Sequence, residues 1–131
     1  SACGLTPQYE DRESLHEQYG KDGLAVLGIP CNKFNKQEPG RDADIAKFCT
    51  SNYKVKLDMF SKVDVNGDGA TPLYKYLTGL EAKPKGKGKV SWNFEKFLIG
   101  RDGSVVARFE PKTAPDDPAV IKVLEAELAK K

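Results

Sequence analysis

The stretch LAVLGI at residues 24–29 decides the fold class of this chain, because it is a continuous apolar run between turn residues. Gly23 precedes the run and Pro30 follows it. An uninterrupted apolar run of this length favours a strand that is buried on both faces, as in a parallel sheet. The run is far shorter than the roughly 20 apolar residues that cross a bilayer as a helix.

The segment before this run predicts a helix over residues 7–20. Thr6 can cap the first turn, and Pro7 suits the first helical position. The apolar stripe of this helix is thin and consists of Tyr9, Leu15 and Tyr19. A helix followed by a buried strand is the beginning of an α/β arrangement.

The rest of the chain predicts a series of short elements. They are a loop over 30–40, helices over 42–49, 72–77 and 117–129, and strands over 59–65, 94–99 and 105–109. The Asp102-Gly103 turn between the last two strands predicts an antiparallel hairpin. Mixed parallel and hairpin elements with helices indicate an α/β layer fold, and we expect one domain over residues 1–131.

Composition excludes several classes of protein. Of the 131 residues, 21 are Lys or Arg and 19 are Asp or Glu, which leaves a net charge of +2. That balance is not typical of a strongly basic nucleic-acid binder. With 39% hydrophobic and 31% charged residues, the chain is too apolar to be disordered and too polar to be a membrane protein.

The cysteines point to thiol chemistry. Three cysteines, Cys3, Cys31 and Cys49, are too few and odd in number for a disulfide framework, and one histidine leaves too few ligands for zinc. We therefore expect no metal site, no cofactor, and a reducing, cytoplasmic compartment. No targeting segment is visible, and an organellar address stays open if residues precede Ser1.

Cys3 lies three residues before the expected Thr6-Pro7 helix start. Unpaired N–H groups and the positive end of the helix dipole favour a thiolate there, and the thiolate is the reactive form. The alternative is an inert N-terminal cysteine. Three further side chains, Gln37, Trp92 and Asn93, can donate a hydrogen bond to a thiolate, although each of them alone is unspecific.

Several separated motifs resemble the glutathione peroxidase family in the same order along the chain. They are CGLT at 3–6, GIPCNKF at 28–34, QEPG at 37–40, DVNG at 64–67 and WNFEKFL at 92–98. The resemblance implies a thioredoxin-like fold, with a mixed sheet flanked by helices. It places Cys3 at the position of the peroxidatic cysteine or selenocysteine, supported by Gln37, Trp92 and Asn93.

The same resemblance implies a thiol peroxidase that reduces hydrogen peroxide and organic or lipid hydroperoxides. Cys49 matches the place of the resolving cysteine in thioredoxin-dependent members, so we expect a Cys3–Cys49 disulfide that thioredoxin or glutathione reduces. For Cys31 we expect a small buried hydrophobe. An alternative function is a redox sensor or relay that passes the oxidation of Cys3 to a partner protein.

The chain also departs from the family. Relatives have a strand that leads into the active cysteine, whereas only Ser1 and Ala2 precede Cys3 here. We therefore expect an N-terminally truncated domain without that strand, and a fragment that cannot assemble the site is a third interpretation. The short segment between Leu77 and Trp92 resembles monomeric members. Its flexible basic loop, with Lys83, Lys85, Lys87 and Lys89, allows at most transient contact with a membrane surface.

Overall fold

The computed structural model describes residues 1–56 and 58–130, and the chain divides into two compact units. We call Ser1–Asp64 the N-terminal unit and Val65–Lys131 the C-terminal unit. One domain over residues 1–131 stays a prediction. No helix within the described part of the chain is long and apolar enough to cross a membrane.

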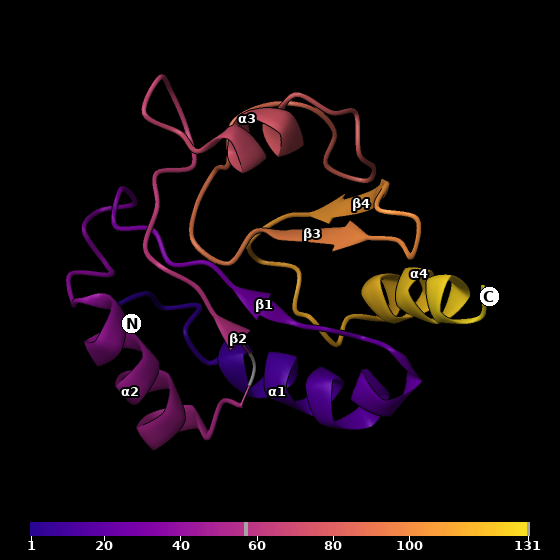
Figure 1. Cartoon of the computed structure of the whole chain (residues 1–131), viewed down its shortest axis with the longest axis horizontal. Helices are drawn as coiled ribbons and strands as arrows, with labels where there is room; N and C mark the ends of the chain where they lie inside the picture. The colour runs from indigo at the N-terminus through magenta and orange to yellow at the C-terminus, as the bar shows by residue number, and fades with distance from the viewer. Residues whose placement is uncertain (57, 131) are drawn as a thin grey trace. The chain divides into compact units, whose positions relative to one another are not determined.

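The N-terminal unit contains helices and one small parallel sheet. Its elements are α1 (Gln8–Tyr19), the 3-10 helix η1 (Gly20–Asp22), β1 (Leu27–Gly28), α2 (Asp42–Tyr53) and β2 (Asp58–Met59). Figure 1 shows β1 and β2 side by side, with Leu27 opposite Asp58 in a parallel pairing. Helices α1 and α2 contact each other. The predicted helix over 42–49 therefore extends four residues further, to Tyr53.

The parallel pairing of β1 is confirmed, but the strand predicted over 24–29 is wrong in its length and burial. Only Leu27 and Gly28 form the strand, and Leu27 is 50% exposed. Among the described residues β1 has a hydrogen-bonded neighbour on one side only, so the other side leaves Leu27 uncovered. The strand predicted over 59–65 is likewise reduced to Asp58–Met59. Beyond it, Phe60 N–H still donates to the Gly28 carbonyl at 2.8 Å.

Helix α1 begins differently from the prediction. Thr6 does not cap it, because the Thr6 hydroxyl donates to the Cys3 carbonyl oxygen at 2.6 Å. Pro7 already has helical angles, so Thr6 lies within a turn that starts at Cys3 and has no free amide of the next turn within reach. The predicted apolar stripe is confirmed, because Tyr9, Leu15 and Tyr19 are all buried.

The C-terminal unit consists of α3 (Pro72–Thr78), β3 (Lys96–Ile99), β4 (Val105–Phe109) and α4 (Pro118–Leu128). The antiparallel hairpin of β3 and β4 is confirmed, with Gly103 in the left-handed region at φ +85°. Asp117 caps α4 by accepting a hydrogen bond from Ala119 N–H at 2.8 Å. The hairpin packs against α4 through a buried cluster of Ala107, Phe109 and Val120, with Leu98 and Val123 at its edge.

The described strands form two separate two-stranded sheets, one parallel and one antiparallel, where we expected one mixed sheet. A continuous sheet requires a strand that bridges β1 and β3. None of the described residues supplies such a strand. The α/β class and its helix and strand order are confirmed.

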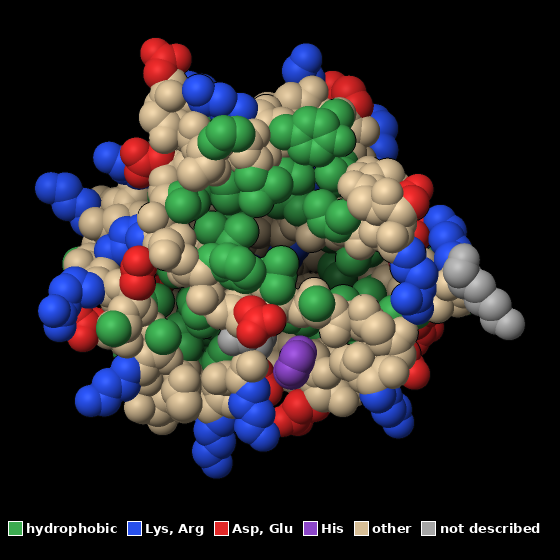
Figure 2. All heavy atoms as spheres, in the orientation of Figure 1, with side chains coloured by type: hydrophobic (Ala, Val, Ile, Leu, Met, Phe, Trp, Pro, Cys, Tyr) green, Lys and Arg blue, Asp and Glu red, His purple; other side chains and the backbone are tan. Residues whose placement is uncertain are grey.

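The basic segment 83–89 is not the flexible loop that its composition predicts. Lys85 N–H donates to the Arg108 carbonyl at 3.1 Å, and Arg108 N–H donates to the Lys83 carbonyl at 2.9 Å, so the segment lies along β4. Gly86 and Gly88 provide the positive φ angles that its turns require. Figure 2 shows basic and acidic side chains mixed around the rim of the face in view.

Candidate functional site

Cys3 is a buried free thiol in the turn that leads into α1. The backbone N–H of Leu5 donates a hydrogen bond to Cys3 Sγ at 3.4 Å. The turn itself is closed by the Thr6 N–H, which donates to the Cys3 carbonyl at 3.0 Å. A backbone N–H that points at the sulfur is the contact that the helix-start argument predicts for this position.

The N-terminal unit brings the backbone of Gln37 next to the residue that precedes Cys3. Ala2 N–H donates to the Gln37 carbonyl oxygen at 2.9 Å. Glu38, the residue after Gln37, is held by two hydrogen bonds. Its N–H donates to Asn32 Oδ1 at 2.9 Å, and Lys62 Nζ donates to its carbonyl at 2.6 Å. Asn32 and Lys62 were missed by sequence reasoning, because a side chain that anchors a distant loop carries no local pattern.

Cys49 lies on α2 and is 1% exposed. The Tyr9 hydroxyl from α1 forms a hydrogen bond with the Cys49 sulfur. Burial raises the pKa of the Cys49 thiol, and the hydrogen bond from Tyr9 acts in the opposite direction. Burial also raises the pKa of the Tyr9 hydroxyl well above its usual range, so this group remains a donor.

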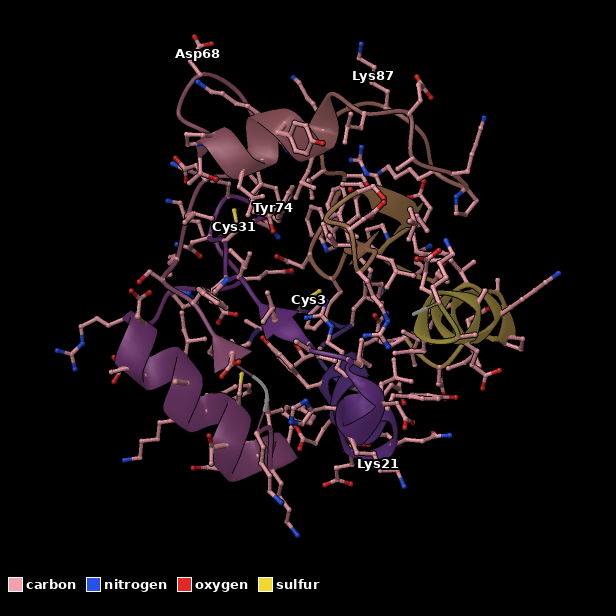
Figure 3. All side chains as sticks on the ribbon, turned by 45° about the vertical axis from the view of Figure 1, so that its right-hand side comes forward. Cys3, Lys21, Cys31, Asp68, Tyr74 and Lys87 are labelled. Atoms are coloured by element: carbon pink, nitrogen blue, oxygen red, sulfur yellow. The ribbon has the colours of Figure 1, made fainter. Side chains whose placement is uncertain are left out.

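All three cysteines are free thiols in the structure, and the Cys3–Cys49 disulfide stays a prediction. Cys31 is buried, as expected for a small hydrophobe. Figure 3 shows Cys31 well separated from Cys3. Among the described residues, no group of three or more His, Cys, Asp or Glu side chains could hold a metal ion.

The C-terminal unit places Trp92 and Asn93 in a braced turn directly before β3. Trp92 is 37% exposed, so it is not the core residue that a lone tryptophan usually is. The carboxylate of Glu95 reaches back across the turn, where Oε1 accepts from Ser91 N–H and from Ser91 Oγ, each at 3.1 Å. Phe94 has φ +66°, a region that a bulky residue rarely adopts and that is often found at functional sites.

A buried network of charges fixes this turn. Arg108 is fully buried on β4, and its Nε donates to Glu95 Oε2 at 2.8 Å. The other guanidinium nitrogens donate to the Gly86 and Lys89 carbonyls, each at 3.0 Å. Burial acts to raise the pKa of the Glu95 carboxyl, but hydrogen bonds from Lys85, Ser91 and Arg108 hold that pKa below its usual value.

Two of the four side chains in this network could have been suspected from the sequence. Arg108 stands between Ala107 and Phe109 in a strand whose other residues are apolar, and a charge in that place needs a partner. Glu95 lies in the strand predicted to pair with it. Lys85 and Ser91 give no such signal.

The predicted site residues form two groups, one in each unit. The N-terminal unit holds Cys3 with the neighbouring Gln37 backbone, and the C-terminal unit holds Trp92 and Asn93 on one turn. That the two groups form one site stays a prediction. A buried thiol that accepts a hydrogen bond from a backbone N–H can act as a nucleophile toward an electrophilic atom.

Comparison with known proteins adds an independent finding. A family model described as glutathione peroxidase matches residues 1–78. The Escherichia coli thioredoxin/glutathione peroxidase BtuE is 44% identical over 99% of this chain and 81% of its own length. The Synechocystis hydroperoxy fatty acid reductase Gpx2 is 48% identical over 98% of this chain and 79% of its own. The crystal structure of T. cruzi GPX1 superposes with a TM-score of 0.71 at 34% identity, covering 98% of this chain and 76% of that one.

Proposed function

The chain belongs to the glutathione peroxidase family, and we propose that Cys3 is the thiol with which it reduces hydroperoxides. It is a peroxidase oxidoreductase of the thioredoxin-like fold. The observation that carries the assignment of Cys3 is the Leu5 N–H aimed at its sulfur within a buried turn. Of the three cysteines, Cys3 is the one that lies at a helix start.

In the first step the Cys3 thiolate attacks the distal oxygen of the hydroperoxide. The S–O bond forms as the O–O bond breaks, and the departing oxygen takes a proton and leaves as water or alcohol. Cys3 becomes a sulfenic acid. We assign Gln37, Trp92 and Asn93 as neutral donors that stabilise the charge on sulfur and on the departing oxygen, because all three carry N–H groups and none adds a net charge.

In the second step the Cys49 thiol attacks the oxidised Cys3 sulfur. The S–S bond forms, the S–O bond breaks, and the hydroxyl leaves as water with the Cys49 proton. A dithiol or thiol reductant then restores both cysteines. The printed name of the E. coli relative includes both thioredoxin and glutathione, and we propose these two as candidate co-substrates, with no resident cofactor.

We further propose that lipid hydroperoxides are substrates, because the Synechocystis relative is named for hydroperoxy fatty acids. The exposed side chains of Leu73, Tyr76 and Trp92 offer apolar surface of the kind that an acyl chain can contact. We propose that Lys83, Lys87 and Lys89, which are exposed, make the transient contact with a membrane surface. The side chain of Lys85 is only 11% exposed and pairs with Glu95, so it is withdrawn from that role. We retain a monomer in a reducing cytoplasm as the working proposal.

The test is peroxide consumption by the Cys3→Ser and Cys49→Ser variants, coupled to NADPH through thioredoxin or through glutathione. We expect Cys3→Ser to be inactive with every peroxide. Cys49→Ser should consume one equivalent of peroxide and lose turnover with thioredoxin. Cys31→Ser is the matched control and should retain turnover.

Three outcomes would change the proposal. Activity of Cys3→Ser at the level of the unmodified chain would remove Cys3 from the chemistry. Stoichiometric oxidation of the unmodified chain without continuing NADPH consumption would favour the redox relay over the peroxidase. Rapid reduction of hydrogen peroxide together with no reduction of a fatty-acid hydroperoxide would exclude the lipid substrate.

A further inference from the structure

Helix α1 presents two buried polar side chains on one face. Tyr9 and Glu13 are four residues apart, so their side chains lie one above the other on the helix. Both are among the buried residues of α1. A buried carboxylate and a buried hydroxyl need partners, because each would otherwise be desolvated without compensation.

Both partners lie at the end of α2. The Tyr9 hydroxyl forms its hydrogen bond with the Cys49 sulfur. Glu13 Oε2 accepts a hydrogen bond from the backbone N–H of Lys56 at 2.7 Å. The rings of Tyr9 and Tyr53 also approach each other, with centroids 5.8 Å apart. Helix α1 thus binds both ends of the segment from Cys49 to Lys56.

The C-terminal end of α2, which lies within this segment, is suited to local opening. Cys49 lies in the last turns of α2, four residues before its final residue Tyr53. The helix closes through Lys54, which has φ +53°, a left-handed conformation that is unfavourable for a residue other than glycine. The Cys49 carbonyl accepts hydrogen bonds from the Val55 N–H, at 3.3 Å, and from the capping N–H of Lys54. Fraying of this end would release Cys49 while the first turns of α2 persist.

We propose that Tyr9 and Glu13 form a latch on the end of α2 that keeps Cys49 buried and limits how fast it reaches oxidised Cys3. This inference rests on the proposed resolving role of Cys49. The step that the latch controls is the attack of the Cys49 thiol on the Cys3 sulfenic acid, which yields the disulfide and one water. Tyr9 and Glu13 are positioning residues, because neither is required to touch the peroxide.

The latch has a consequence for the oxidation state of Cys3. A sulfenic acid that waits for Cys49 can react with a second peroxide and become a sulfinic acid, which thiols do not reduce. The rate of release therefore sets the peroxide concentration at which the enzyme inactivates itself. A tighter latch makes the enzyme more sensitive to high peroxide, and a looser latch makes it more resistant.

The test uses Tyr9→Phe and Glu13→Gln in rapid-quench experiments with one equivalent of hydrogen peroxide. Tyr9→Phe keeps the ring and removes the hydroxyl, and Glu13→Gln keeps the shape and removes the charge that strengthens the bond to Lys56 N–H. We expect peroxide loss in the first step to stay within about twofold. Disulfide formation, measured by mass spectrometry after alkylation, should be about fivefold faster in Tyr9→Phe, which corresponds to about 1 kcal/mol for one lost hydrogen bond.

Matched controls are Ser14→Ala and Glu17→Gln, which remove an exposed hydroxyl and an exposed charge from α1. Both should form the disulfide at the rate of the unmodified chain. Amide hydrogen exchange over residues 50–56 should accelerate in the latch variants and not in the controls. The peroxide concentration that half-inactivates the enzyme should rise in Tyr9→Phe.

Disulfide formation at an unchanged or slower rate in both latch variants would overturn the latch. If Tyr9→Phe fails to fold, Glu13→Gln alone decides, since it preserves volume. Failure of the proposed function would be seen differently: the unmodified chain would form no Cys3–Cys49 disulfide at all after peroxide treatment.

Discussion

The two compact units hold their proposed site residues by different means. In the N-terminal unit the sulfur atoms of Cys3 and Cys49 accept hydrogen bonds from uncharged donors, a backbone N–H and a tyrosine hydroxyl. In the C-terminal unit the turn that carries Trp92 and Asn93 is fixed by a buried carboxylate with a guanidinium and an ammonium beside it. A reacting sulfur that must move between two partners needs weak restraints, whereas donors that stabilise charge act best when they are fixed.

The largest effect is expected from breaking the buried charges. Arg108→Met leaves the Glu95 carboxylate with Lys85 and Ser91 and removes the donors to the Gly86 and Lys89 carbonyls. Removing one partner of a buried pair destabilises by about 3–5 kcal/mol. Denaturant unfolding followed by the fluorescence of Trp92, the only tryptophan, measures this loss. The double variant Glu95→Leu/Arg108→Met should recover part of the stability, and an Arg108→Met chain as stable as the original would show that the network is not what fixes the turn.

Acid should weaken the C-terminal unit through Glu95. The folded-state pKa of this carboxyl lies below its usual value, so the folded state binds its proton less readily than the unfolded state does. The stabilisation from Glu95 is therefore present above about pH 4.3, the ordinary pKa of a glutamate, and is lost as pH falls through the lower folded pKa. Fluorescence of Trp92 against pH should show an acid step. Glu95→Gln, which has no proton to gain, should lack this step.

A smaller effect is expected from tightening the N-terminal unit. Lys54→Gly places the residue that prefers the left-handed region at the end of α2, and we expect about 1 kcal/mol of added stability. Local opening of the last turn should become rarer, so disulfide formation after peroxide treatment should slow by several-fold. Rapid-quench measurement checks this rate. Lys47→Gly, in the middle of α2, is the opposite control and should destabilise the helix.

The smallest effect is expected from an ion pair on the surface. Arg41 and Asp44 pair at 3.0 Å with side chains that are 87% and 53% exposed. Arg41→Met should change the free energy of unfolding by less than about 1 kcal/mol, because water screens such a pair. The same change of residue type thus separates the exposed pair from the buried one. An equal loss in Arg41→Met and Arg108→Met would remove the contrast between the two units.

Local signals in the sequence predicted most of the elements. The Asp102-Gly103 turn and the alternating residues beside it predicted the β3–β4 hairpin, and Asp117 with Pro118 predicted the start of α4. These features depend on residues within one turn of each other. The strand over 24–29 was overextended, because an apolar run records the burial that a sheet would provide and not whether a neighbouring strand is present.

The candidate site was only partly visible in the sequence. Cys3, Gln37, Trp92 and Asn93 were identified by the family resemblance and by their hydrogen-bonding chemistry, and their joint action remains to be tested. The partners of Cys49 and of the segment that follows it could not be predicted. Tyr9 pairs with Cys49 across 40 residues and Glu13 with Lys56 across 43, and no pattern of spacing records such a pairing. Glu95 and Arg108 came closest, since both are charges within predicted strands.

The alternating lysines and glycines of residues 85–89 have a consequence for protein engineering. By composition they look like a spacer into which a tag could be inserted, but a single guanidinium joins the carbonyls of Gly86 and Lys89. Added length there would pull apart two groups that Arg108 holds together. The exposed turn at Asp68, which projects at the edge of the view in Figure 3, is the more permissive place for a fusion or a fluorescent label.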